Sequence, residues 1–170
     1  MADPQAAKAL TEKLFVDRRG APILIRRAMP ADAEHVIAFV KATDTESTFL
    51  TREAGEFAMA LDVERRYLAH VDGRPNAIYL TAWDAGELVG TIDFHGGNRR
   101  RTGHAGEFGL AVRRSHWGRG LGGQLLDVML NWAAHTGLIA KVKLRVQVGN
   151  DGAIALYRSR GFVEEGLFRA

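Results

Sequence analysis

Cysteine is absent from this chain of 170 residues. Without a thiol the protein forms no disulfide, gives no thiolate to a zinc ion and has no cysteine nucleophile. Any group transfer is therefore direct, or it uses another nucleophile. We expect no metal cofactor.

Long hydrophobic runs are also absent. Every apolar stretch is much shorter than a membrane span, and the first residues, MADPQAAKALTEK, lack the apolar core of a signal peptide. We therefore expect a cytoplasmic protein without a membrane partner.

The chain carries no large excess of either charge. It has 23 Lys and Arg against 20 Asp and Glu, so its formal net charge is +3. An anionic cofactor accounts for this mild basic bias as well as nucleic acid does, and no basic patch interleaved with aromatic residues is present. We expect no nucleic-acid partner.

The composition is that of an ordinary globular domain, with 46% hydrophobic and 25% charged residues. We expect an N-terminal extension over residues 1–21, helical from 5 to 15, followed by a single α/β domain over 22–170. Strand patterns lie at 22–28, 76–83, 88–94, 105–112, 141–148 and from 162 onward. Helix patterns lie at 32–41, 55–69, 122–136 and 151–160.

The most informative segment is Leu110–Leu126, where a strand ends in a glycine-dense turn that leads directly into an amphipathic helix. Glycine lets the backbone approach a ligand closely, and the free N–H groups of a first helical turn attract an anion. Guanidinium groups suit phosphate oxygens. The segment supplies both kinds of residue, at Gly118, Gly120, Gly122, Arg113, Arg114 and Arg119. It predicts a site for the pyrophosphate of a cofactor.

A dinucleotide is one candidate for that cofactor, because Gly118, Gly120 and Gly123 satisfy the pattern G-x-G-x-x-G. The pattern nevertheless comes late in the chain, and no acidic residue ends the next strand to bind a ribose hydroxyl. That strand, 141–148, alternates polar and apolar residues, whereas a central strand of a doubly wound sheet is apolar on both faces. An NAD(P)-dependent reductase therefore remains only an alternative.

The run Trp117-Gly-Arg-Gly-Leu-Gly122, followed by Gln124-Leu-Leu126, resembles the signature Arg/Gln-x-x-Gly-x-Gly/Ala of the GNAT superfamily of N-acetyltransferases. Trp117 stands where that family usually has Arg or Gln. A second block, from Asn150 through Tyr157 to Gly161-Phe162, resembles the closing strand–helix–strand segment of the same family.

The resemblance implies a GNAT fold, in which helices flank a mixed, mostly antiparallel sheet. The fourth and fifth strands, 105–112 and 141–148, would run parallel and splay to admit acetyl-CoA. Only eight residues follow Phe162, so the final strand is expected to be incomplete. We expect an edge near Val146 or Phe168 that is exposed or covered by a partner, for example in a homodimer.

The resemblance also implies which residues bind acetyl-CoA. The backbone of three residues at the end of the fourth strand would contact pantetheine: Leu110, Ala111 and Val112. The turn would hold the pyrophosphate through Trp117, Gly118, Arg119, Gly120, Leu121 and Gly122. Asn150 would lie near the cofactor, cap the helix that follows it, or do both.

Tyr157 follows Asn150 by two helical turns, so both residues can face one side of the helix. In the family a tyrosine here lies near the thioester sulfur and can protonate the departing thiolate. The alternative is a half-buried tyrosine packed with Ile154 under the sheet.

An amine acceptor also needs a base, because deprotonating an ammonium group with a pKa of about 10.4 at pH 7 costs about 4–5 kcal/mol. His104 and Glu107 on the fourth strand are the main candidates, although a regular strand points them to opposite faces. A loop histidine and a salt-bridged surface glutamate are the alternatives. Asp93 and His95 on the preceding strand are lesser options.

In the family, the loop that contains Glu46 and Phe49 borders the acceptor pocket, where a carboxylate suits a cationic amine. The resemblance implies direct transfer of an acetyl group from acetyl-CoA to a primary amine of a small molecule or peptide. A backbone N–H near Val112 would stabilise the oxyanion. A noncatalytic acyl-CoA sensor of the same fold is the other alternative.

Overall fold

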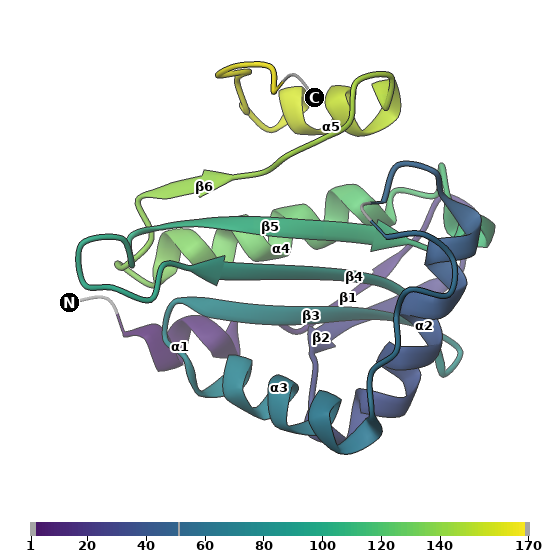
Figure 1. Cartoon of the computed structure of the whole chain (residues 1–170), viewed down its shortest axis with the longest axis horizontal. Helices are drawn as coiled ribbons and strands as arrows, with labels where there is room; N and C mark the ends of the chain where they lie inside the picture. Colours follow the sequence, from purple (N-terminus) through teal and green to yellow (C-terminus); the bar gives the residue numbers. More distant parts are fainter. Residues whose placement is uncertain (1–2, 51, 169–170) are drawn as a thin grey trace.

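The computed structural model describes residues 3–50 and 52–168. One six-stranded sheet, in the order β1-β2-β3-β4-β5-β6, forms its centre (Figure 1). The strands are β1 (Lys13–Val16), β2 (Pro22–Arg27), β3 (Ala77–Asp84), β4 (Glu87–Gly96), β5 (Ala105–Val112) and β6 (Lys141–Lys143). The α-helices are α1 (Pro4–Ala9), α2 (Ala33–Glu46), α3 (Leu61–Gly73), α4 (Leu121–His135) and α5 (Asp151–Ser159).

Helices cover both faces of the sheet because its strands alternate their side chains between two cores. On one face, Phe94 and Phe108 of the sheet pack with Trp132 of α4 in the larger buried cluster. On the other face, α2 and α3 bury a smaller cluster that includes Phe39 and Leu68. The predicted mixed α/β fold is confirmed.

The sheet is mostly antiparallel, with one parallel pair formed by β5 and β6. These are the predicted fourth and fifth strands, which take higher numbers because β1 precedes them. The pair is short: its last partners are Glu107 and Lys143, and residues 144–148 form no strand. Figure 1 shows the chain leaving β5 beyond this pair and leading to α5. The predicted strand over 141–148 is therefore too long.

The expected helix over residues 5–15 is wrong beyond Ala9, because residues 13–16 form β1 and pair antiparallel with β2. The physical reason is that β2 supplies backbone partners for all four residues, which lets Phe15 pack against the larger core while Leu14 and Val16 are exposed. Part of the segment that was expected to precede the domain thus joins the sheet.

Two other boundaries also differ from expectation. The second predicted helix begins at Leu61, about two turns later than the pattern indicated, and ends at Gly73. No strand forms over 162–168, so β6 lies at the edge of the sheet. Near that edge Val146 is 38% and Phe168 86% exposed, as expected.

None of the helices in the described parts of the chain has the length and apolar character that crossing a membrane requires.

Candidate functional site

The glycine-dense turn joins the end of β5 to the start of α4. Gly118 (φ 69°) and Gly120 (φ 94°) both have left-handed backbone, and Gly120 is the N-cap of α4. The first hydrogen bond of the helix runs from the N–H of Gln124 to the carbonyl of Gly120. The N–H groups of Leu121, Gly122 and Gly123 therefore have no partner within the helix. They form a ready site for an anion.

A pocket of about 210 Å³ lies beside this helix start, and its lining includes Arg18, Arg119 and Arg160. The guanidinium group of Arg119 contacts the carboxylates of Asp17 and Asp84, so this residue can serve an anion mainly through its backbone. The guanidinium group of Arg18 donates to the carbonyl oxygen of Gly118 at 3.4 Å, and the backbone N–H of Arg18 donates to the carbonyl of Arg119 at 3.2 Å. The sequence interpretation missed Arg18 and Arg160, because only the fold carries these two segments to the turn.

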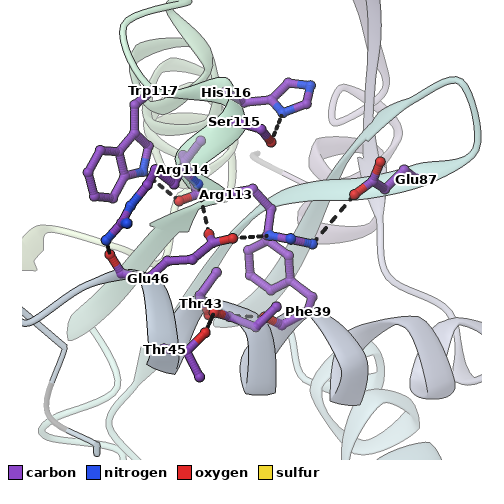
Figure 2. A network of polar contacts seen from close by, with 12 residues as sticks. Phe39, Thr43, Thr45, Glu46, Glu87, Arg113, Arg114, Ser115, His116 and Trp117 are labelled. Atoms are coloured by element: carbon purple, nitrogen blue, oxygen red, sulfur yellow. Dashed lines mark hydrogen bonds and ion pairs between the residues drawn. The ribbon is translucent and has the colours of Figure 1, made fainter. Parts of the chain in front are cut away.

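Glu46 links the end of α2 to the turn (Figure 2). Its carboxylate accepts hydrogen bonds from Nε of Arg113 at 3.0 Å and from the backbone N–H of Arg114 at 2.8 Å. The Arg114 guanidinium also donates to the Glu46 carbonyl. The structure thus shows that Glu46, an expected acceptor contact, holds the two arginines that lead into the glycine-dense turn. Phe49, three residues later, is 41% exposed.

Replacing Glu46 with glutamine should lower the melting temperature by about 2–4 °C, which corresponds to about 1 kcal/mol in a chain of this size. The glutamine keeps the shape of the side chain but loses its charge opposite Arg113. A thermal melt measures the effect. Glu87 is the matched control, because it contacts Arg113 at 3.4 Å with a side chain that is 63% exposed. Equal shifts for both variants would contradict a special role of Glu46.

Trp117 fixes the end of β5. Its indole Nε1 donates a hydrogen bond to the carbonyl of Val112 at 2.8 Å, and the Arg114 guanidinium lies 5.5 Å from its ring centroid. Figure 2 shows the indole beside Arg114, on the outer side of the turn. The residue that departs from the family signature is therefore built into the local structure.

Among the residues that the structure describes, no strand pairs with the outer edge of β5 beyond Glu107. In the antiparallel pair of β5 with β4, successive residues direct their backbone N–H and C=O groups alternately toward β4 and away from it. The hydrogen bond from the N–H of Arg113 to the carbonyl of Val89 shows which residues of β5 face β4. By that alternation Glu107, Gly109 and Ala111 turn their backbone groups toward β4, and the residues between them turn outward. Leu110 can thus offer both of its backbone groups to a ligand and Val112 its N–H, since the Val112 carbonyl accepts from Trp117, whereas Ala111 cannot.

Glu107 and Tyr157 lie on either side of the point where β5 and β6 separate. Glu107 is in the last residue pair, and its carboxylate contacts Arg145 at 3.4 Å. The Tyr157 ring lies 5.6 Å from that of Phe108 and 6.0 Å from that of Phe162. Burial raises the pKa of Tyr157 to about 12. Because neighbouring strand residues point to opposite faces, Glu107 and Tyr157 approach this point from opposite sides of the sheet.

The other two predicted residues occupy different positions. The Asn150 side chain accepts a hydrogen bond from the N–H of Ala153 at 3.3 Å, which is the expected capping role. His104 lies in an exposed turn at the far end of β5, where its carbonyl accepts the N–H groups of Ala140 and Lys141. The structure therefore separates His104 from the open edge of the strand.

The α3 side of the sheet holds polar side chains next to Glu107. His95 of β4 is directly opposite Glu107 in the register, and its ring contacts Asp93 and Tyr67. Asp93 and His95 were lesser candidates for the base from sequence, and no sequence signal pointed to Tyr67. Within residues 3–50 and 52–168, no group of three or more His, Asp or Glu side chains is arranged to hold a metal ion.

Comparison with known proteins agrees with this geometry. The model of the Acetyltransferase (GNAT) family matches residues 42–162. A 93-residue stretch is 30% identical to the L-amino acid N-acetyltransferase AaaT of Escherichia coli, covering 55% of this chain and 57% of that protein. A 95-residue stretch is 35% identical to the N-alpha-acetyltransferase RimI of Mycobacterium tuberculosis, covering 56% and 58%. Each match spans less than two thirds of the relative.

Solved structures show the same likeness. A GNAT-family acetyltransferase from Streptococcus pneumoniae is 30% identical, with a TM-score of 0.83 over 85% of this chain and 86% of that one. The yncA protein of Salmonella typhimurium, solved with its cofactor acetyl-CoA, is 19% identical, with a TM-score of 0.71 over 85% and 81%, which shows a shared fold alone. The family model covers most of this chain, including the turn, the open strand edge and α5, and the chain therefore belongs to the GNAT family of acetyltransferases.

Proposed function

We propose that this protein transfers an acetyl group from acetyl-CoA directly to a primary amine of a small molecule or peptide. The observation that carries the proposal is the open edge of β5, which starts at Glu107 and ends at the glycine-dense turn. Five strand residues separate these two ends, a span of about 16 Å. One end suits phosphate groups and the other holds ionisable side chains.

The residues present fit acetyl-CoA along that edge. The unpartnered N–H groups at the start of α4 would hold the pyrophosphate, and the outward backbone groups of Leu110 and Val112 would bind the pantetheine amides. The relatives support an amine acceptor, since one is named for L-amino acids and another for an N-alpha amine.

Glu107 would take a proton from the ammonium group of the acceptor, so that the free amine attacks the thioester carbonyl carbon. The resulting oxyanion needs an N–H donor. Because the pairing of Glu107 with Lys143 uses the N–H of Phe108, the first free outward N–H belongs to Leu110. We therefore assign the oxyanion contact to Leu110, and no longer to the neighbourhood of Val112.

Collapse of the intermediate breaks the carbon–sulfur bond, and the second proton of the attacking nitrogen passes to the departing sulfur, whose developing negative charge Tyr157 would stabilise. The Tyr157 pKa of about 12 keeps the phenol protonated at neutral pH. A thiol has a pKa of about 8.5, so complete proton transfer from the phenol to the thiolate is uphill. A hydrogen bond from the phenol to the sulfur fits these values better than full protonation.

Acetyl-CoA turnover with a panel of amines tests the proposal. The panel contains a polyamine, an amino acid, an aminoglycoside and a peptide with a free N-terminus, and release of the CoA thiol is measured. We expect thiol release with at least one amine. Binding of acetyl-CoA without turnover on an extended panel would favour the sensor, and binding of NAD(P)H instead of CoA would favour the reductase.

Replacing Tyr157 with phenylalanine should lower kcat by about 10- to 100-fold, the value of a hydrogen bond to a charged group. The Kd of acetyl-CoA should stay the same, because the ring and its packing remain. Phe162→Leu is the control, since it disturbs the same aromatic cluster without removing a hydroxyl group. If Tyr157→Phe turned over like the wild type, the phenol would have no part in the reaction.

A further inference from the structure

A histidine held by two oxygen atoms lies on the α3 side of the sheet. The Nε2 atom of His95 is 3.0 Å from the Tyr67 hydroxyl and 3.0 Å from Oδ2 of Asp93. Asp93 and His95 alternate on β4, and Tyr67 reaches them from α3. The side chains of Asp93 and His95 are about one third exposed, so protons can exchange with solvent there.

The register of the sheet brings this histidine next to the proposed base. His95 and Glu107 are directly opposite partners on β4 and β5, so their side chains share a face with Cβ atoms about 4.5–5.5 Å apart. Gly109 lies opposite Asp93, where a Cβ atom would come within 3.1 Å of the Asp93 carboxylate. The missing side chain at Gly109 leaves room around this carboxylate.

The contacts determine which ring nitrogen can accept a proton. A carboxylate accepts hydrogen bonds, so the contact with Asp93 assigns the ring hydrogen of His95 to Nε2, and the Tyr67 hydroxyl oxygen is then an acceptor at the same atom. The lone pair of the neutral ring is then on Nδ1, which has no hydrogen-bond partner in the described parts of the chain.

Other ionisable groups surround the cluster of His95, Asp93 and Tyr67. Glu64 comes from α3, like Tyr67 itself, Tyr79 from β3 and Glu107 from β5, and Arg74 follows α3. Burial, together with the charge of Asp93, raises the pKa of both tyrosines, so they remain neutral phenols. Burial also raises the pKa of Glu64.

An imidazole is the side chain that changes its charge near neutral pH. Among the described groups around Glu107, His95 is the one imidazole. The cluster thus contains a proton acceptor, its orienting carboxylate and a phenol that restrains the ring.

We propose that His95, oriented by Asp93 and Tyr67, relays the acceptor proton from Glu107 to solvent. This step rests on the proposed acetyl transfer. The ammonium N–H bond breaks and its proton passes to the Glu107 carboxylate. The proton then moves to Nδ1 of His95, directly or through one water, which restores the carboxylate and forms an imidazolium. The imidazolium releases the proton to solvent, so charge and protons balance.

The test is the dependence of kcat/KM on pH for the wild type and His95→Gln. The glutamine amide can still donate to Asp93 but cannot carry a second proton. We expect kcat/KM at pH 7 to fall about tenfold, and the part of the acid limb due to imidazole to disappear. The Kd of acetyl-CoA should not change. Asp93→Asn should likewise lower kcat/KM at pH 7 and reduce the same part of the acid limb.

His135→Gln is the control, because His135 lies in the last turn of α4 and contacts the carbonyl of Asn131. Its profile should match that of the wild type. External imidazole should restore part of the rate to His95→Gly, which a purely structural role for His95 would not allow.

Two negative results have different meanings. If the wild type acetylates an amine and His95→Gln keeps its pH profile, the relay is wrong and the proposed function stands. If the wild type releases no thiol with any amine, the proposed function fails, and the relay fails with it. Thermal melts of each variant show whether it folds. If His95→Gln does not fold, Tyr67→Phe, which keeps the imidazole, is tested in its place.

Discussion

Replacing Glu107 with glutamine should lower kcat/KM at pH 7 by about 10²- to 10⁴-fold, the usual contribution of a positioned base. Glu107 occupies the last residue pair before β5 and β6 separate, on the face that an acceptor would approach from α2 and α3. A glutamine amide fills the same space but takes no proton. The variant must therefore use the small fraction of acceptor that is already deprotonated.

This explanation predicts a specific pH dependence. An amine with a pKa of about 10.4 becomes about tenfold more deprotonated with each unit of pH. The kcat/KM of Glu107→Gln should therefore rise about tenfold with each unit of pH up to about pH 10, where it should approach that of the wild type. The measurement is kcat/KM from pH 6 to 10 with the best amine of the panel.

Arg145→Gln serves as the matched control. Arg145 is the ion-pair partner of Glu107, but both side chains are largely exposed, so the pair contributes little. This variant should stay within a few-fold of the wild type. Full activity of Glu107→Gln at pH 7 would show that the base lies elsewhere.

The second large effect is expected for acetyl-CoA binding at the glycine-dense turn between β5 and α4. Gly120→Val should raise the Kd of acetyl-CoA at least tenfold, because φ at this N-cap is 94° and a β-branched residue is strained there by about 1–3 kcal/mol. Relief of that strain would turn the first N–H groups of α4 away from the pyrophosphate. Calorimetric titration with acetyl-CoA measures the change.

Gly86→Val is the control that distinguishes the effect of backbone strain on stability from an effect on acetyl-CoA binding. Gly86 has a φ of 86° in the tight turn between β3 and β4, so valine there has a similar conformational cost without altering the helix start. Both variants should melt at lower temperature, but only Gly120→Val should lose affinity for acetyl-CoA. An unchanged Kd in Gly120→Val would mean that the pyrophosphate binds at another place.

The largest difference between sequence and structure concerns Glu46. The family resemblance, together with its charge, favoured an acceptor contact, whereas the folded chain pairs Glu46 with Arg113 and Arg114, 67 and 68 residues away. No local pattern encodes a contact at this separation. The same holds for Tyr67, which reaches His95 only because α3 packs on the sheet.

The expected N-terminal helix was wrong beyond Ala9 for a related reason. Apolar residues in a segment of four fit a helix turn or a strand equally well, and β2 decides the outcome by supplying backbone partners for Lys13–Val16. The short β6 has the same explanation. The alternation of polar and apolar residues in 141–148 indicates a strand, but the length over which this strand pairs depends on β5.

The sequence by itself determined the local structures whose cause is local. The strand at 105–112, the left-handed glycines of the turn, the helix after them and the Asn150 cap each follow from residue types at fixed spacing. The tertiary structure alone decided which of these residues meet. It separated His104 from the open edge, placed Glu107 opposite His95 and brought Tyr157 to Phe108, because strand register and helix packing join residues far apart in the chain.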